Sequence, residues 1–97
     1  MVHNELAEIV RNNQIAKNIY EAVLLSPKIS NISKPGQFIN ILPKENWTHV
    51  MRRPMSIAWQ KNNQISIIYK VFGVGTEIIS NWNIGDKVDI IGPLGNY

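Results

Sequence analysis

The sequence predicts an all-β fold, a small six-stranded antiparallel Greek-key barrel with one short helix. Three features favour this fold class: the apolar segments are short, turn signals separate them, and no helical segments alternate with them. Closing six strands into a barrel would also remove the exposed edges that an open sheet leaves. With 97 residues, of which 44% are hydrophobic and 18% charged, the chain is expected to form one globular domain over residues 1–97.

Two strands are expected near the N-terminus. Residues 7–11 form the first candidate, although residues 6–10 could also be helical, and we favour a strand because the neighbouring segments read as strands. The polar run Asn12-Asn13-Gln14 is expected to separate this strand from the next one. In the second candidate, residues 19–25, the side chains are compatible with the period of two of a strand.

A third strand follows the strongest turn signal in the chain. Ser33-Lys34-Pro35-Gly36 is typical of a turn, and residues 37–42 predict a strand that Pro43 ends. Residues 44–51 are then expected to form a loop.

The best hairpin of the sequence comes next. Residues 54–59 and 65–72 predict two antiparallel strands, joined by a polar turn at residues 60–64. In the second strand Ser66 and Lys70 should share one face, opposite the apolar side chains.

The C-terminal part predicts the helix and the last strand. Thr76 is expected to cap a single helix over residues 76–82, because a threonine side chain satisfies the first free amides of a helix. Gly85 follows the helix, and residues 87–91 predict the sixth strand. Residues 92–97 read as a turn-rich tail beyond that strand, as at a domain junction.

Composition restricts the classes of function. With zero cysteines the chain has no disulfide, no thiolate metal site and no thiolate-held iron–sulfur cluster. His3 and His49 have no acidic or sulfur companions nearby in the sequence, so no metal site is predicted. The carboxylates are scattered and no Ser-His-Asp arrangement can be argued, so no catalytic residue is predicted either.

Charge and hydropathy bear on partners and location. The net charge of +3 is compatible with a phosphate ligand or with nucleic acid. No apolar run approaches the roughly 20 residues that cross a bilayer, and the N-terminus lacks the pattern of a secretory signal. We therefore expect a soluble, cytoplasmic protein without a membrane partner.

Two short motifs carry the strongest functional signal. In Arg53-Pro54-Met55-Ser56 the arginine offers a permanent fork of donors for phosphate oxygens, and the proline keeps the backbone extended. About twenty residues later, Gly73-Val74-Gly75-Thr76 offers backbone amides that a phosphate can approach. Two sets of phosphate donors suit a dinucleotide cofactor.

These motifs, together with Pro35-Gly36-Gln37-Phe38, residues 67–71 and residues 92–96, resemble the FAD-binding barrel of the ferredoxin–NADP reductase superfamily. Within it they are similar to the electron-transfer subunits of the dihydroorotate dehydrogenase branch, which serves pyrimidine biosynthesis. The resemblance runs from residue 13 to residue 96, with the motifs in the order and spacing of the family.

The resemblance implies an oxidoreductase flavoprotein that relays electrons between NAD and a flavin-bearing catalytic subunit. Relatives continue into an NAD domain and, in this branch, a cysteine-rich segment that holds an iron–sulfur cluster. This sequence corresponds to the first part only, so we expect it not to be active alone. The implied partners are FAD and either the catalytic dihydroorotate dehydrogenase subunit or the NAD and iron–sulfur domains.

The resemblance also implies roles for individual residues. Arg53 would pair with the FAD pyrophosphate, and Ser56 would place its hydroxyl near the reactive nitrogen of the flavin ring. Met55 stands where many relatives have tyrosine, and would make an apolar contact instead of an aromatic stack. The strand at residues 69–71 would line the ring with its backbone. The expected cofactor-binding residues are Arg53, Pro54, Met55, Ser56, Tyr69, Lys70, Val71, Gly75 and Thr76.

Several alternatives stay open. Arg52 should point to the other side of the extended segment from Arg53, and is expected at the surface or against a partner. Trp47, Trp59 and Trp82 are more typical of core or interface positions than of cofactor stacking.

Two rival functions also stay open. A small basic barrel could bind nucleic acid, with Trp59 and Tyr69 as the candidates for base stacking. This function fits less well, because the glycines lie where a phosphate turn is wanted. The chain could also keep the barrel as an interaction domain that binds no cofactor.

Overall fold

The computed structural model describes residues 1–44 and 52–95. Trp47, His49, all but the first residue of the expected loop at 44–51, and the end of the expected tail lie outside the described residues.

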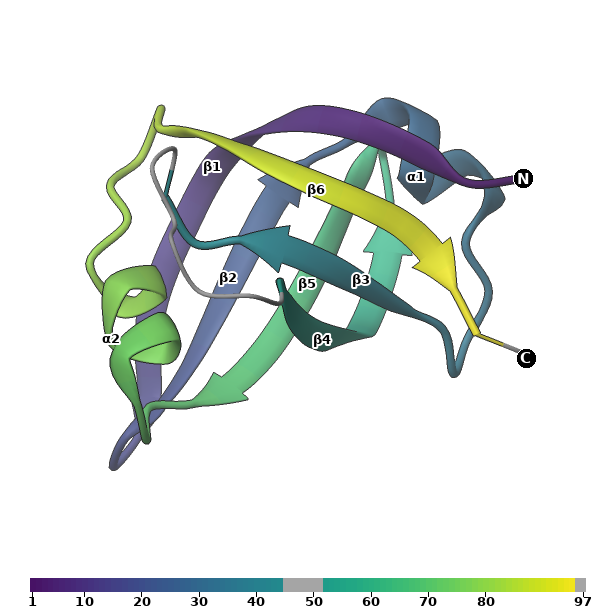
Figure 1. Ribbon diagram of the computed structural model, residues 1–97. Helices are drawn as coiled ribbons and strands as arrows, with labels where there is room; N and C mark the ends of the chain where they lie inside the picture. The colour runs from purple at the N-terminus through teal and green to yellow at the C-terminus, as the bar shows by residue number, and fades with distance from the viewer. Residues whose placement is uncertain (45–51, 96–97) are drawn as a thin grey trace.

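Six antiparallel strands close into a barrel in the order β1-β2-β5-β4-β3-β6 (Figure 1). Their bounds are β1 (His3–Ala16), β2 (Ile19–Leu25), β3 (Phe38–Leu42), β4 (Arg53–Lys61), β5 (Gln64–Lys70) and β6 (Lys87–Leu94). Strands β3, β4 and β5 are consecutive neighbours, and β6 returns to lie beside β3, which is the Greek-key arrangement. The predicted all-β barrel is confirmed.

The inside of the barrel is filled mainly by isoleucine side chains, whose branched Cβ suits a pleated strand. Every strand contributes at least one buried apolar residue to this cluster. The isoleucines with 0% exposure are Ile9, Ile29, Ile39, Ile41, Ile65, Ile67, Ile79 and Ile90. Side chains that point outward from the same strands are therefore the ones that can meet a ligand.

The first hairpin differs from the expectation. Residues 6–10 are strand, not helix, and β1 continues through the Asn12-Asn13-Gln14 run that we expected to separate two strands. The turn lies instead at Lys17-Asn18, where Asn18 has φ 60. Strand β1 tolerates Asn12 because its side-chain amide accepts a hydrogen bond from the Tyr69 hydroxyl at 2.8 Å and donates to the Ile79 carbonyl oxygen at 2.8 Å.

The second hairpin is confirmed, with a tighter turn. Only Asn62 and Asn63 form the turn, with φ 52 and 64, so β4 and β5 extend into the segment 60–64 that we expected to be loop. Ser66, which we expected on the same face of β5 as Lys70, is buried, whereas Lys70 is exposed. The Ser66 side chain is fully buried, because its hydroxyl donates a hydrogen bond to Glu21 at 2.7 Å.

The last strand is longer than expected. Residues 92–94, which we assigned to a tail, belong to β6, and both Gly92 and Pro93 are buried. They extend the pairing of β6 with β1 and β3, which closes the barrel.

Two short helices lie at opposite ends of the barrel (Figure 1). The sequence interpretation did not single out α1 (Pro27–Ile32), which lies at the end where Figure 1 shows both ends of the chain. The expected helix is α2 (Val74–Ser80), but it begins after Gly73, so Thr76 lies inside the first turn and is not the cap residue. Among the described residues, no helix has the length and apolar character needed to cross a membrane.

Candidate cofactor site

Arg53 is the first residue of β4, and its guanidinium lies over the ring of Phe72, with 5.8 Å between the guanidinium carbon and the ring centroid. Within the described part of the chain, no carboxylate pairs with this guanidinium. Its N–H donors therefore remain available to an anionic ligand.

Arg52, one residue earlier, has a different environment. Its Nη1 donates to the Asp89 carboxylate at 2.9 Å and to the Asp89 carbonyl oxygen at 3.1 Å. We expected Arg52 at the surface, but the ion pair leaves its side chain only 24% exposed. The expectation that the two arginines diverge is confirmed, and Arg52 is engaged with β6.

The turn that precedes α2 is organised by Thr76. The Thr76 hydroxyl accepts hydrogen bonds from the backbone N–H of Phe72 at 3.0 Å and of Gly73 at 3.2 Å. Thr76 is only 2% exposed, so its hydroxyl stabilises the turn from the buried side. Because Phe72 contacts Arg53, this turn lies next to the start of β4. The two sequence motifs are therefore neighbours in the fold.

The expected cofactor residues divide between the two sides of the barrel wall. Pro54, Ser56 and Lys70 are exposed, so their side chains can meet a ligand on the outer face. Met55 and Tyr69 belong to the core, with 7% and 4% exposure. The apolar ligand contact of Met55 stays a prediction, and the structure places this side chain in the core cluster.

The remaining residues of the expected set are also partly enclosed. Val71 packs against the core cluster, and Gly75 is buried in the first turn of α2. Neither Gly73 nor Gly75 has positive φ, so the turn does not need glycine for its backbone conformation. An added Cβ at Gly73 would meet nothing within 4 Å, which indicates open space beside this amide.

Tyr69 connects the site to the core. Its ring stacks on Tyr20, with centroids 5.7 Å apart, and its hydroxyl donates to Asn12. Burial raises the pKa of Tyr69 above its usual range, while the hydrogen bond to Asn12 acts in the opposite direction. The phenol is therefore neutral at physiological pH, which suits a structural role.

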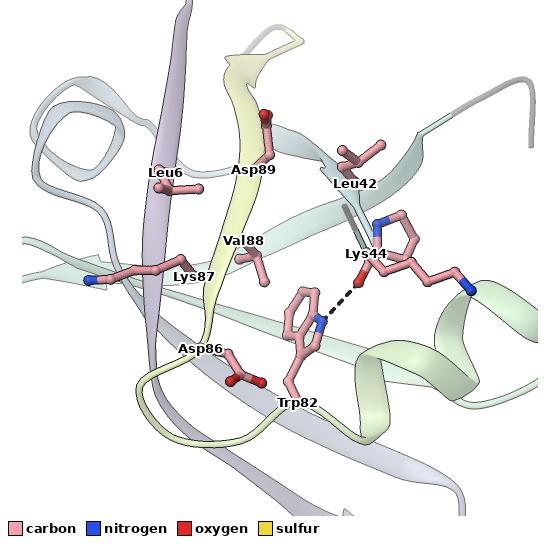
Figure 2. A pocket seen from close by; sticks show the side chains of 9 residues that line it. Leu6, Leu42, Lys44, Trp82, Asp86, Lys87, Val88 and Asp89 are labelled. Atoms are coloured by element: carbon pink, nitrogen blue, oxygen red, sulfur yellow. Dashed lines mark hydrogen bonds between the residues drawn. The ribbon is translucent and has the colours of Figure 1, made fainter. Parts of the chain in front are cut away.

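A cavity of about 570 Å³ lies on another part of the barrel, between the β3–β6 surface and the end of α2 (Figure 2). None of the expected cofactor residues lines it. Figure 2 shows the Trp82 indole at its edge, donating a hydrogen bond to the Pro43 carbonyl oxygen at 3.1 Å. Three of its charged residues already have partners in the chain: Asp89 pairs with Arg52, Lys87 with Glu8, and Asp86 with the backbone of Asn83.

Sequence reasoning missed Phe72. Its side chain is 70% exposed, although it stands between the two motifs and contacts a residue of the first. The available signal was an aromatic residue at the end of an otherwise regular strand, immediately before the glycine turn. Among the described residues, no group of histidine, aspartate and glutamate side chains could hold a metal ion.

Comparisons with known proteins agree with the fold and the motifs. No protein-family model matches the sequence. The chain is 37% identical, over 99% of its length, to the dihydroorotate dehydrogenase B (NAD(+)) electron transfer subunit of Bacillus mycoides (strain KBAB4). It is 36% identical, again over 99% of its length, to the subunit of the same name from Bacillus cereus (strain B4264). The chain spans 38% of the length of these curated relatives.

Solved structures give the same result. A structure of NADH-dependent reduced ferredoxin–NADP oxidoreductase, described for flavin-based electron bifurcation, matches with a TM-score of 0.86 and 34% identity. That match covers 95% of this chain and 33% of the other. The ferredoxin–NADP⁺ reductase of Plasmodium falciparum matches with a TM-score of 0.72 and 20% identity, over 96% of this chain and 39% of the other, and supports the fold alone.

The barrel and its structural neighbours define the class: a barrel of the ferredoxin–NADP reductase superfamily. Within that superfamily, the chain is similar to the electron transfer subunits of dihydroorotate dehydrogenase B over 38% of their length, as its motifs predicted.

Proposed function

We propose that this chain is the FAD-binding part of an electron-transfer protein of the dihydroorotate dehydrogenase type. The observation that carries the proposal is the guanidinium of Arg53, which no described carboxylate neutralises and which lies beside the turn that leads into α2. A permanently charged fork of donors in this position suits a pyrophosphate. The similarity to named electron transfer subunits supplies the class of reaction.

One group of residues would hold the pyrophosphate of FAD, and another would face its flavin part. Arg53 and the backbone amides of Gly75 and Thr76 would hold the pyrophosphate, since the Gly73 amide already donates to the Thr76 hydroxyl. Ser56 and Lys70, exposed on the neighbouring strands β4 and β5, would face the flavin part, and the strand backbone near Met55 and Tyr69 would line it. Bound FAD would accept and pass on electrons, while the chain fixes its position.

The wider electron relay needs other parts. All strand pairings between the described residues are antiparallel, so this barrel offers no parallel strand–helix–strand unit for a nicotinamide dinucleotide. The NAD site and the electron acceptor would lie in another part of the protein or in a partner. We propose as partner the flavin-bearing catalytic subunit of dihydroorotate dehydrogenase, in the cytoplasm and in pyrimidine biosynthesis.

The nucleic-acid alternative loses its supporting residues. Tyr69 is 4% exposed and lies inside the barrel, so it cannot stack on a base. The Trp59 indole nitrogen donates to Glu21 at 3.1 Å, which gives this tryptophan a structural partner on the outer face. Trp59 and Tyr69 therefore do not form the stacking platform of a single-strand-binding barrel.

Flavin titration of the arginine variants tests the proposal. We expect FAD to bind more tightly than FMN, because FMN has one phosphate for two sets of donors. Arg53→Ala should weaken FAD binding by about 1.5 to 3 kcal/mol, the range for hydrogen bonds to a charged group. Arg52→Ala is the matched control and should have little effect, because Asp89 already holds that guanidinium.

Two other outcomes would contradict the proposal. Equal affinities for FAD and FMN, or a larger loss at Arg52 than at Arg53, would show that the phosphate site lies elsewhere. A chain that binds neither flavin would favour the interaction domain without cofactor.

A further inference from the structure

Phe72 is an exposed aromatic side chain on a well-fixed backbone. Its ring is 70% exposed, whereas its backbone N–H and that of Gly73 both donate to the buried Thr76 hydroxyl, at 3.0 and 3.2 Å. The backbone therefore presents the ring in a defined place. Exposure of a large apolar surface at such a place calls for a physical reason.

The guanidinium of Arg53 supplies that reason. It lies over the face of the Phe72 ring, at 5.8 Å from the centroid, within the range of a cation–π contact. In general, an arginine stacked on an aromatic face keeps its N–H edges free, and these edges are what bind phosphate oxygens. An arginine side chain without such a contact loses more rotamer entropy when it meets a ligand.

We propose that Phe72 is a positioning residue, whose ring holds the guanidinium of Arg53 ready for the phosphate groups of the cofactor. The inference rests on the proposed function, because it concerns how Arg53 binds FAD. Phe72 also joins the two halves of the site, since Thr76 fixes its backbone and Arg53 covers its ring.

A different role for Phe72 is direct stacking of its ring on an aromatic ring of the ligand. The two roles differ in their dependence on Arg53. A positioning role disappears when the arginine is removed, whereas direct stacking persists, so a double-mutant cycle distinguishes them.

The test uses Phe72→Ala, Phe72→Tyr and the control Ile84→Ala, which removes an exposed apolar side chain outside both motifs, 76% exposed. We expect Phe72→Ala to weaken FAD binding about three- to fivefold, as an exposed cation–π contact would. Phe72→Tyr keeps the ring face and should restore the affinity, and Ile84→Ala should leave it unchanged. In the Arg53→Ala background, Phe72→Ala should cause no further loss.

Two results would overturn the inference: no loss of affinity in Phe72→Ala, or the same loss with and without Arg53. A second measurement needs no ligand. Proton NMR of the free protein should show ring-current shifts of the Arg53 side chain that Phe72→Ala abolishes and Phe72→Tyr retains. Absence of FAD binding in the unmodified chain would refute the proposed function and with it the positioning role, while absence of the ring-current shift would refute the Arg53–Phe72 contact alone.

Discussion

Arg52 and Arg53 are adjacent in the chain and have the same side chain, yet they have different roles. Arg52 makes an ion pair with Asp89 of β6, whereas the Arg53 guanidinium lies over the ring of Phe72 and has no carboxylate partner among the described residues. The free energy gained by binding a phosphate is smaller for an arginine that already has a carboxylate partner than for one that has none. At the scale of the residue, the site is defined by which arginine the fold leaves without an anion.

Glu21 of β2 is a carboxylate whose surroundings lower its pKa. The hydrogen bond from Ser66 is the main effect that holds the pKa of Glu21 below its usual value; burial opposes it, and Trp59 and Arg11 add to the lowering. Ser66 is fully buried and Trp59 donates at 3.1 Å, so the carboxylate joins β2 to both β4 and β5.

The lowered pKa predicts a pH-dependent contribution to stability. A carboxyl with a lower pKa in the folded state stabilises the fold above its ordinary pKa, about 4.3 for glutamate, and loses this contribution as the pH falls through the folded-state value. Glu21→Gln should therefore unfold at lower urea concentration than the unmodified chain at pH 7, and the difference should shrink at about pH 3. Glu77→Gln, on exposed α2, controls for the loss of one charge; a Glu21→Gln difference that stays constant with pH would contradict the prediction.

At the scale of the element, helix α1 is stabilised by a residue of strand β1 that is far from it in the sequence. Glu5 of β1 accepts hydrogen bonds from the Ser26 hydroxyl at 2.6 Å and from the backbone N–H of Lys28 and Ile29, both at 3.2 Å. The negative charge thus lies at the N-terminal end of the helix, where it is stabilising. No side chain of the helix itself caps this end.

Removal of this cap should destabilise the protein. Glu5→Ala leaves amides of the first turn without their acceptor, and we expect a loss of about 1 to 2 kcal/mol in the free energy of unfolding. Glu8→Ala is the control on the same strand, because its ion pair with Lys87 is largely exposed and such pairs contribute about 0 to 1 kcal/mol. Urea denaturation of both variants measures the difference, and an equal loss in the two would show that Glu5 does not act as a cap.

At the scale of the whole molecule, the barrel depends on the junction of β3 and β6. β6 advances from Ile91 to Leu94 while β3 advances only from Phe38 to Asn40, so the register shifts here. Gly92 lies in this irregular stretch, and a Cβ built on it would stand 2.8 Å from the Ile39 Cγ2 atom and 3.3 Å from the Phe38 carbonyl oxygen. Strands this close leave no room for a side chain.

A methyl group at this junction should strain the closure of the barrel. We expect Gly92→Ala to lower the free energy of unfolding by about 1 to 3 kcal/mol, as overpacking of a dense interior does. Gly73→Ala is the matched control, because an added Cβ there meets nothing within 4 Å and its φ of −163° suits any residue. Thermal or urea unfolding gives the comparison; if Gly92→Ala is as stable as Gly73→Ala, the junction is less tightly packed than these distances indicate.

The sequence by itself determined the all-β class, the positions of six strands and one helix, and the order of the motifs that relate the chain to electron transfer subunits. These features are local: proline, glycine and alternating side chains act within a few residues. Only the tertiary structure decided that Asp89 would neutralise Arg52, that Phe72 would lie under Arg53, and that Glu5 would cap α1. It also turned Met55 inward, buried Ser66 beneath Glu21, and carried β1 through its asparagines. Each of these outcomes depends on a partner far away in the sequence, and the barrel closure alone brings such partners within hydrogen-bonding or packing distance.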